Sequence, residues 1–149
     1  MPIRTIAAVA IALLAGTTLA LAVTKDEAVT MVKKAVATIK NQGIEKTYAA
    51  INTPNSRFVD GEIYIVVQGF NGVTLAHATN PKLIGKNLAN DLDVDGKPFS
   101  KDLGELGKTQ AAFWYDFKFV NPATKKIQVK DLYCESLNQT IVCTGVYRL

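Results

Sequence analysis

The sequence predicts an α+β domain in which helices come first and a five-stranded antiparallel sheet follows. Between positions 25 and 42, apolar residues recur every three or four positions, which is the period of an amphipathic helix. From position 62 onward, short runs rich in Val, Ile and aromatic residues are separated by turn residues, which is typical of strands. The expected order is two helices, a hairpin, a long insertion and three further strands, with the strands in a meander.

The first 22 residues have the pattern of a secretory signal peptide. Arg4 gives a positive start, an uncharged stretch rich in Ala, Ile and Leu follows from Thr5, and the stretch ends in the A-x-A cleavage pattern of residues 20–22. We therefore expect export to the periplasm or out of the cell, with residues 23–149 forming one domain. The apolar stretch is about 18 residues, near the lower limit for a spanning helix, so an uncleaved membrane anchor is the alternative.

Composition excludes several functions for the exported part. Removing residues 1–22 takes away Arg4 and no acid, so the formal charge falls from +4 to +3. The lysines are spread along the chain without a clustered basic stripe, which argues against nucleic acid as a partner. No second long apolar segment, kinase or DNA-binding domain follows in the sequence. We therefore expect a signal to leave through a membrane-bound signalling partner or through the ligand itself.

The first helix has clear start and stop signals. Thr24 and Glu27 have the spacing of a capping box, in which each side chain satisfies a free backbone donor. Gly43 is a candidate C-cap. A second short helix is expected over residues 45–51.

The Asn71-Gly72 pair predicts a two-residue type I′ turn between strands 62–70 and 73–79. Opposed residues then have numbers that sum to 143, and His77 shares a sheet face with Tyr64 because side chains alternate. The expected pairs are Phe70 with Val73, Gln68 with Leu75, Val66 with His77, and Tyr64 with Thr79.

Residues 80–110 read as a loop with short helices, because prolines and glycines interrupt every periodic run. Strands are then expected over 112–120, 126–137 and 140–147. A tight turn at Asn138-Gln139 joins the last two.

The last turn also predicts a disulfide. With a two-residue turn, opposed residues sum to 277, so Cys134 faces Cys143 on a closely spaced, non-hydrogen-bonded pair. Export supplies an oxidising compartment. The spacing is not C-x-x-C, which argues against redox catalysis.

Six segments in order carry a family resemblance: DGEIYIVV at 60–67, GVTLAH at 72–77, NPKLIGKN at 80–87, DVDGKPF at 93–99, WYDFKFVNP at 114–122, and the strands from 130 to 147. Together they resemble the single Cache family of extracytoplasmic sensor domains, over roughly residues 25–149. The resemblance implies a PAS-like five-stranded sheet packed on a long N-terminal helix, with a ligand pocket between the sheet and the insertion.

The resemblance also implies a function. Cache domains typically sense small carboxylates for chemoreceptors and kinases, so the expected ligand is a small organic acid such as pyruvate, lactate or acetate. Neither a cofactor nor catalysis is expected. The sequence itself has no Gly-rich phosphate loop, nucleophile elbow or zinc-binding histidine pair. Two departures from the family pattern are Phe117 in place of tyrosine and Val120 in place of proline.

Two residues rank first as ligand-binding candidates. His77 is the single histidine and matches the family's histidine before Asn-Pro, and Lys130 matches its fourth-strand lysine. A carboxylate needs a cation or several donors in a partly dry cleft. The remaining candidates are aromatic residues that could wall the cleft: Tyr64, Trp114, Tyr115, Phe117, Tyr133 and Tyr147. Strand alternation, however, puts Trp114 and Tyr115 on opposite faces of the sheet. It also puts Lys130 and Tyr133 on opposite faces, whereas Lys130 shares its face with Tyr147.

Two other functions stay open from the sequence. Asp91, Asp93, Asp95 and Asp102 have calcium-loop spacing, although position twelve is Asp rather than Glu and a proline occupies position eight. The other alternative is a structural or protein-interaction module whose pocket is filled by its own side chains.

Overall fold

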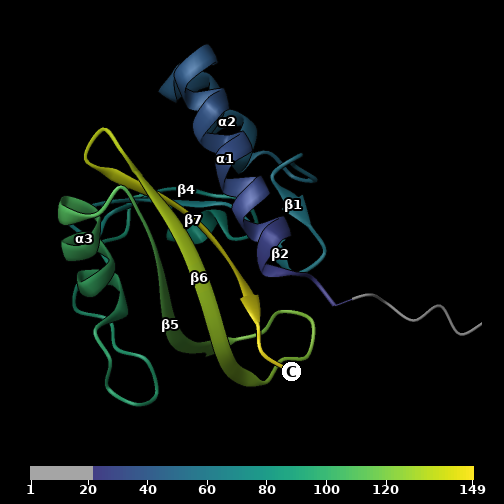
Figure 1. Ribbon diagram of the computed structural model, residues 1–149, viewed down its shortest axis with the longest axis vertical. Helices are drawn as coiled ribbons and strands as arrows, with labels where there is room; N and C mark the ends of the chain where they lie inside the picture. Colours follow the sequence, from purple (N-terminus) through teal and green to yellow (C-terminus); the bar gives the residue numbers. More distant parts are fainter. Residues whose placement is uncertain (1–21) are drawn as a thin grey trace, which may run out of the picture.

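The computed structural model describes residues 22–149 as two helices, a five-stranded antiparallel sheet and a third helix (Figure 1). The elements in order are α1 Lys25–Gln42, α2 Ile44–Asn52, β1 Val59–Asp60, β2 Ile63–Tyr64, β3 Val66–Gly69, β4 Thr74–His77, the 3₁₀ helix η1 Pro81–Leu83, α3 Phe99–Thr109, β5 Ala112–Val120, β6 Ile127–Leu137 and β7 Thr140–Tyr147. The signal peptide predicted for residues 1–22 lies, apart from Ala22, outside the described residues. In the part of the chain that is described, no helix has the length and apolarity needed to span a membrane.

The capping box of α1 is confirmed. The Thr24 N–H donates to the Glu27 carboxylate at 2.7 Å, and the Glu27 N–H donates to the Thr24 hydroxyl at 3.3 Å. The helix ends at Gly43, which has a positive φ of 86° and donates its N–H to the Ile39 carbonyl at 2.9 Å. Its apolar face packs on β6 and β7, so the amphipathic pattern places α1 on one face of the sheet.

The strand order in the sheet is β4-β3-β7-β6-β5, with antiparallel pairing throughout. The expected meander is therefore wrong at one junction: the first hairpin joins the other three strands through β3, which pairs with β7, whereas a meander would pair β4 with β5. All eight residues of β7 are buried, which suits a central strand covered on both faces. The hairpin β3–β4 and the meander β5–β6–β7 thus join in the PAS-like arrangement.

The first hairpin keeps the predicted register only at its open end. Val66 pairs with His77 as expected, but Gln68 pairs with Thr74 because a β-bulge shifts the register by one residue. Thr74, and not Leu75, consequently shares the face of His77. The predicted pairing of Gln68 with Leu75 is wrong for this reason.

The hairpin turn is also wider than the predicted two-residue turn. The Gly69 N–H donates to the Val73 carbonyl and the Gly72 N–H to the Gly69 carbonyl, both at 2.9 Å. Phe70 does not pair with Val73, because its N–H donates to the Gln139 carbonyl in the neighbouring turn at 3.0 Å. At the other end β4 stops at His77, and Tyr64 lies in β2, where it pairs with Val59 and not with Thr79.

Helix α3 covers the face of the sheet opposite α1 (Figure 1). It runs for 11 residues through two glycines that the sequence pattern treats as interruptions. A Cβ on Gly104 would lie 2.2 Å from the Phe70 carbonyl oxygen, and one on Gly107 would lie 2.6 Å from Ile141. These glycines allow the helix to approach the sheet closely, which is a packing role and not a helix-breaking one.

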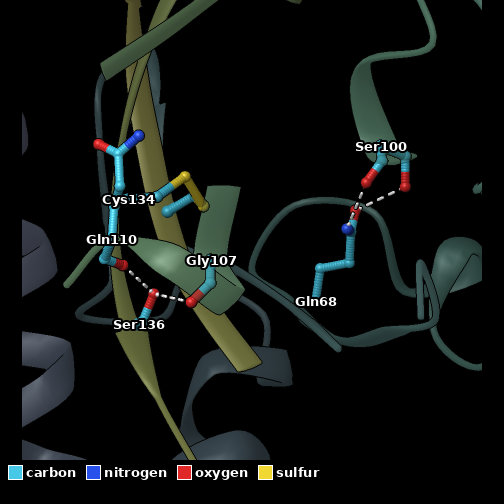
Figure 2. The surroundings of a disulfide bond; sticks show 7 residues. Gln68, Ser100, Gly107, Gln110, Cys134 and Ser136 are labelled. Atoms are coloured by element: carbon cyan, nitrogen blue, oxygen red, sulfur yellow. Dashed lines mark hydrogen bonds between the residues drawn. A yellow bond between two sulfur atoms is a disulfide. The ribbon is translucent and has the colours of Figure 1, made fainter. Parts of the chain in front are cut away.

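Both ends of α3 are tied to the sheet by side-chain hydrogen bonds (Figure 2). Near its start, Gln68 on β3 accepts from the Ser100 hydroxyl at 2.8 Å and donates to the Ser100 carbonyl at 2.9 Å. At its end, the Ser136 hydroxyl on β6 donates to the carbonyls of Gly107 and Gln110 at 2.9 and 2.7 Å. The helix is therefore a fixed cover over this face.

The last hairpin matches its prediction. Asn138 and Gln139 both have positive φ, of 50° and 60°, and the β6–β7 pairs sum to 277. Cys134 and Cys143 form the predicted disulfide, with their Cα atoms 4.2 Å apart. The covalent link joins β6 to the central strand β7 beneath α3 (Figure 2).

Candidate functional site

A cavity of about 150 Å³ lies between the sheet and the segment from η1 to α3, where the resemblance implied a pocket. The sheet supplies its floor and the insertion supplies its cover. The polar residues of its lining are Tyr64, Gln68, Thr74, His77, Asp91 and Lys130, and the other ten lining residues are Val, Leu, Ile, Phe and one Cys.

Lys130, on β6, carries a buried positive charge in this lining. Only 3% of the residue is exposed. Its Nζ donates to the Tyr64 hydroxyl at 3.1 Å, and lies 4.2 Å from the centre of that ring and 5.1 Å from the Tyr147 ring. No carboxylate among residues 22–149 comes within 4.0 Å of this ammonium. A buried ammonium that contacts one tyrosine hydroxyl and two aromatic rings, with no carboxylate beside it in the described residues, favours an anion in the cavity.

His77, at the end of β4, presents a neutral imidazole to the same cavity. Its Nδ1 accepts hydrogen bonds from the N–H groups of Thr79 at 3.3 Å and Asn80 at 3.0 Å. Burial, together with the nearby charge of Lys130, lowers the pKa of His77 to about 4. Since Nδ1 is an acceptor, the proton of the neutral ring sits on Nε2, which is left to donate. The ring stacks on Tyr64 with centroids 5.3 Å apart.

The structure brings together four of the eight predicted ligand-binding residues. Tyr64, His77, Phe117 and Lys130 line the cavity. Tyr147 lies behind them, because its ring flanks Lys130 while its hydroxyl donates to the Val120 carbonyl at 3.0 Å. Burial and the adjacent Tyr64 raise the pKa of Tyr147.

Tyr115 lies on the cavity side of β5 but turns toward α3. Its hydroxyl donates to Asp102 at 2.7 Å, and burial and that carboxylate raise the pKa of Tyr115. It supports the cover and is not among the lining residues.

Trp114 and Tyr133 lie on the other face of the sheet, as strand alternation requires. Their rings are 5.1 Å apart, and the Lys25 ammonium at the start of α1 lies 4.9 Å from the indole ring. Tyr133 packs into the core under α1, while 40% of Trp114 is exposed. These two aromatics are therefore not among the residues that line the cavity.

The sequence pattern missed several lining residues. Thr74 reaches the cavity only because of the bulge in the first hairpin. Leu83, Leu88, Phe99 and Leu103 belong to the insertion, where no regular period identifies the inward face. Strand alternation does place Gln68 on the face of His77, which was a usable signal, but its amide serves to hold α3.

The four carboxylates of the calcium-loop pattern are used separately. Asp93 accepts from three backbone N–H groups, at 2.9 to 3.0 Å, which lower its pKa. Asp95 forms an ion pair with Lys118 at 2.9 Å, and Asp102 accepts from a tyrosine hydroxyl. Asp91 borders the cavity. Over residues 22–149, no three His, Cys, Asp or Glu side chains are grouped to hold a metal ion, so the geometry lends the calcium interpretation no support.

Three solved structures share this fold. A methyl-accepting chemotaxis protein from Vibrio parahaemolyticus RIMD 2210633 is 20% identical, with a TM-score of 0.69 over 83% of this chain and 87% of that one. The periplasmic sensor domain of a chemotaxis protein is 19% identical, with a TM-score of 0.61 over 82% and 88%. A Cache chemosensory domain, solved for the structural basis of carboxylic acid recognition, is 18% identical, with a TM-score of 0.61 over 82% and 86%. No curated protein sequence matches the chain significantly.

The sequence profile of the Single Cache domain 2 family matches residues 17–148, which is nearly the whole chain. The observed strand order, the α1 packing and the position of the cavity agree with that match. The chain therefore belongs to the Single Cache domain 2 family, a family of sensory ligand-binding domains.

Proposed function

We propose that this domain is an exported sensor module that binds a small organic acid and performs no reaction on it. The observation that carries the proposal is the buried Lys130 ammonium, which borders the cavity without a carboxylate partner in the described part of the chain. A ligand carboxylate would supply the missing anion. The similar Cache chemosensory domain that was solved to explain carboxylic acid recognition also supports an organic acid as the ligand.

The polar groups around Lys130 suit one carboxylate. One of the three ammonium hydrogens is directed to Tyr64, so two are left to donate to ligand oxygens. The Nε2–H of His77 is a third donor, and it is neutral at physiological pH because the pKa of His77 is about 4. Charge-assisted hydrogen bonds of this kind are short and strong, and the apolar surroundings strengthen the attraction.

Export and signalling belong to the same proposal. The charged, apolar and A-x-A regions of residues 1–22 support export, and extracytoplasmic Cache domains support a periplasmic or secreted location. The signal would then pass to a membrane-bound partner of the chemotaxis type. The cavity of about 150 Å³ argues against the alternative of a module whose own side chains fill its pocket.

A ligand screen tests this function directly. The purified protein is titrated with acetate, pyruvate, lactate, propionate and longer acids, and its melting temperature is followed. An acid at 100 times its Kd should stabilise the folded state by about 2.7 kcal/mol, because it binds only that state. The shift should vanish in Lys130→Met and persist in Lys126→Met, which removes an equal charge at an exposed site. If no acid raises the melting temperature, the proposed function is wrong.

A further inference from the structure

We infer that the ligand is a monocarboxylate with an apolar body of about three or four carbons, and not pyruvate, lactate or a dicarboxylate. This inference rests on the proposed function, because it assumes that the ligand carboxylate binds at Lys130. It concerns the part of the ligand beyond its carboxylate, and it is inferred from the residues that line the cavity.

Most of the cavity wall is apolar. Phe99 and Leu103 come from α3, Phe117 from β5 and Leu132 from β6, and Leu83 and Leu88 close the insertion side. The Gln68 amide, which could otherwise read a keto or hydroxyl group, is bonded through both its oxygen and its nitrogen to Ser100. A polar group on the body of the ligand would lose its water and gain little in exchange. An alkyl body loses nothing there.

The size of the cavity points to the same class. An apolar cavity of about 150 Å³ accommodates a molecule the size of benzene, which has about six non-hydrogen atoms. Pyruvate has as many, but three of them are oxygens, so only its methyl group would gain from contact with the apolar wall. A body of three or four carbons, as in butyrate and pentanoate, fills the space beside the carboxylate and gains from its burial.

Asp91 adds a negative charge to the lining of the cavity. It is exposed and is the one carboxylate in the described lining. It would repel the second carboxylate of a diacid whose first carboxylate sits on Lys130. An α-amino acid is also disfavoured, because its ammonium is attached next to the carboxylate and would lie beside Lys130.

Three acids that differ at one end test this inference. Pentanoate, glutarate and 5-aminopentanoate share a five-carbon chain and a carboxylate, and differ in carrying a methyl, a carboxylate or an ammonium group at the far end. Their Kd values are measured by isothermal titration calorimetry at pH 7, beside acetate, propionate and pyruvate. We expect affinity to rise about fourfold for each methylene from propionate to pentanoate. Glutarate should bind at least about tenfold more weakly than pentanoate.

Variants identify the cause of the discrimination. Asp91→Asn should narrow the gap between glutarate and pentanoate, whereas Glu105→Gln, an equal charge change on the exposed side of α3, should leave the gap as it is. Leu103→Asn places a polar group in the apolar wall, and should reduce the affinity for pentanoate more than that for acetate.

The outcomes separate the two proposals. If pyruvate or glutarate binds more tightly than pentanoate and that binding requires Lys130, the ligand class is wrong while the proposed function stands. Tighter binding of 5-aminopentanoate, lost in Asp91→Asn, would also overturn the class, in favour of a ligand with opposite charges at its two ends. If none of the acids binds, the proposed function itself fails.

Discussion

Replacing Lys130 with methionine should stabilise the protein in the absence of ligand while abolishing its response to acids. Lys130 is buried, with only 3% of the residue exposed, and desolvation of a buried ammonium costs several kcal/mol. One hydrogen bond from the ammonium to Tyr64 returns about 1.5 to 3 kcal/mol, and the two ring contacts return about 0.5 to 2 kcal/mol each. At the lower end of these ranges, about 2.5 kcal/mol in all, the contacts fall short of the desolvation cost, and methionine removes the difference while keeping most of the aliphatic volume.

We therefore expect Lys130→Met to raise the free energy of unfolding by about 1 kcal/mol and the melting temperature by about 3 to 5 °C. Urea unfolding of the ligand-free protein measures the first quantity and calorimetry the second. Lys126→Met, at an exposed position, should change the free energy of unfolding by less than about 0.5 kcal/mol. A loss of 2 kcal/mol or more in Lys130→Met would refute the reasoning, because the ammonium would then be a stabilising core group and not one kept for an anion.

Three further predictions concern stability. Between pH 6.5 and about 4, His77 is protonated in the unfolded chain but not in the folded domain, so the free energy of unfolding should decrease by roughly 2 to 3 kcal/mol as the pH is lowered through this range. In His77→Asn, which keeps an acceptor in the place of Nδ1, the free energy of unfolding measured with urea should depend less steeply on pH. An equal pH dependence in the variant and the wild type would contradict the assignment. Reduction of the Cys134–Cys143 disulfide should lower the free energy of unfolding by about 2 to 3 kcal/mol, and an unchanged urea midpoint in dithiothreitol would show that the hairpin does not need it. Asp131 accepts a hydrogen bond from Arg148 at 3.0 Å, and this bond is the main reason that the pKa of Asp131 is lowered. Asp131→Asn should therefore reduce the free energy of unfolding by about 1 kcal/mol at pH 7. That stability is present above the unfolded pKa of 3.8 and is lost as pH falls through the lower folded pKa, so a difference between variant and wild type that persists at pH 2 would be inconsistent with an ionic role.

Local signals in the sequence predicted α1, α2, the three long strands and one register correctly. The capping box, the amphipathic period and the Asn138-Gln139 turn each depend on neighbouring residues, so α1 and the disulfide hairpin follow from short-range chemistry. The same register placed Lys130 beside Tyr147 and on the face opposite Tyr133. This is why the two residues ranked first, Lys130 and His77, both border the cavity.

Features set by tertiary packing could not be predicted in this way. The pairing of β3 with β7 joins residues more than 70 positions apart, and the bulge that brings Thr74 to the cavity arises where that sheet meets the turn. Gly104 and Gly107 read as helix interruptions because their need for close approach to the sheet exists only in the folded protein. Trp114 is an aromatic residue of the kind that often lines pockets, but it is not part of this cavity lining because it lies on the other face of the sheet.

The most direct test of the central claim is a crystal structure of the protein with bound pentanoate. The account predicts one carboxylate in the cavity, with an oxygen within about 3 Å of the Lys130 Nζ, a hydrogen bond from the Nε2 of His77, and the alkyl chain along Phe117 and Leu103. A carboxylate bound away from Lys130, or an acid found only on the outer surface of the sheet, would contradict it.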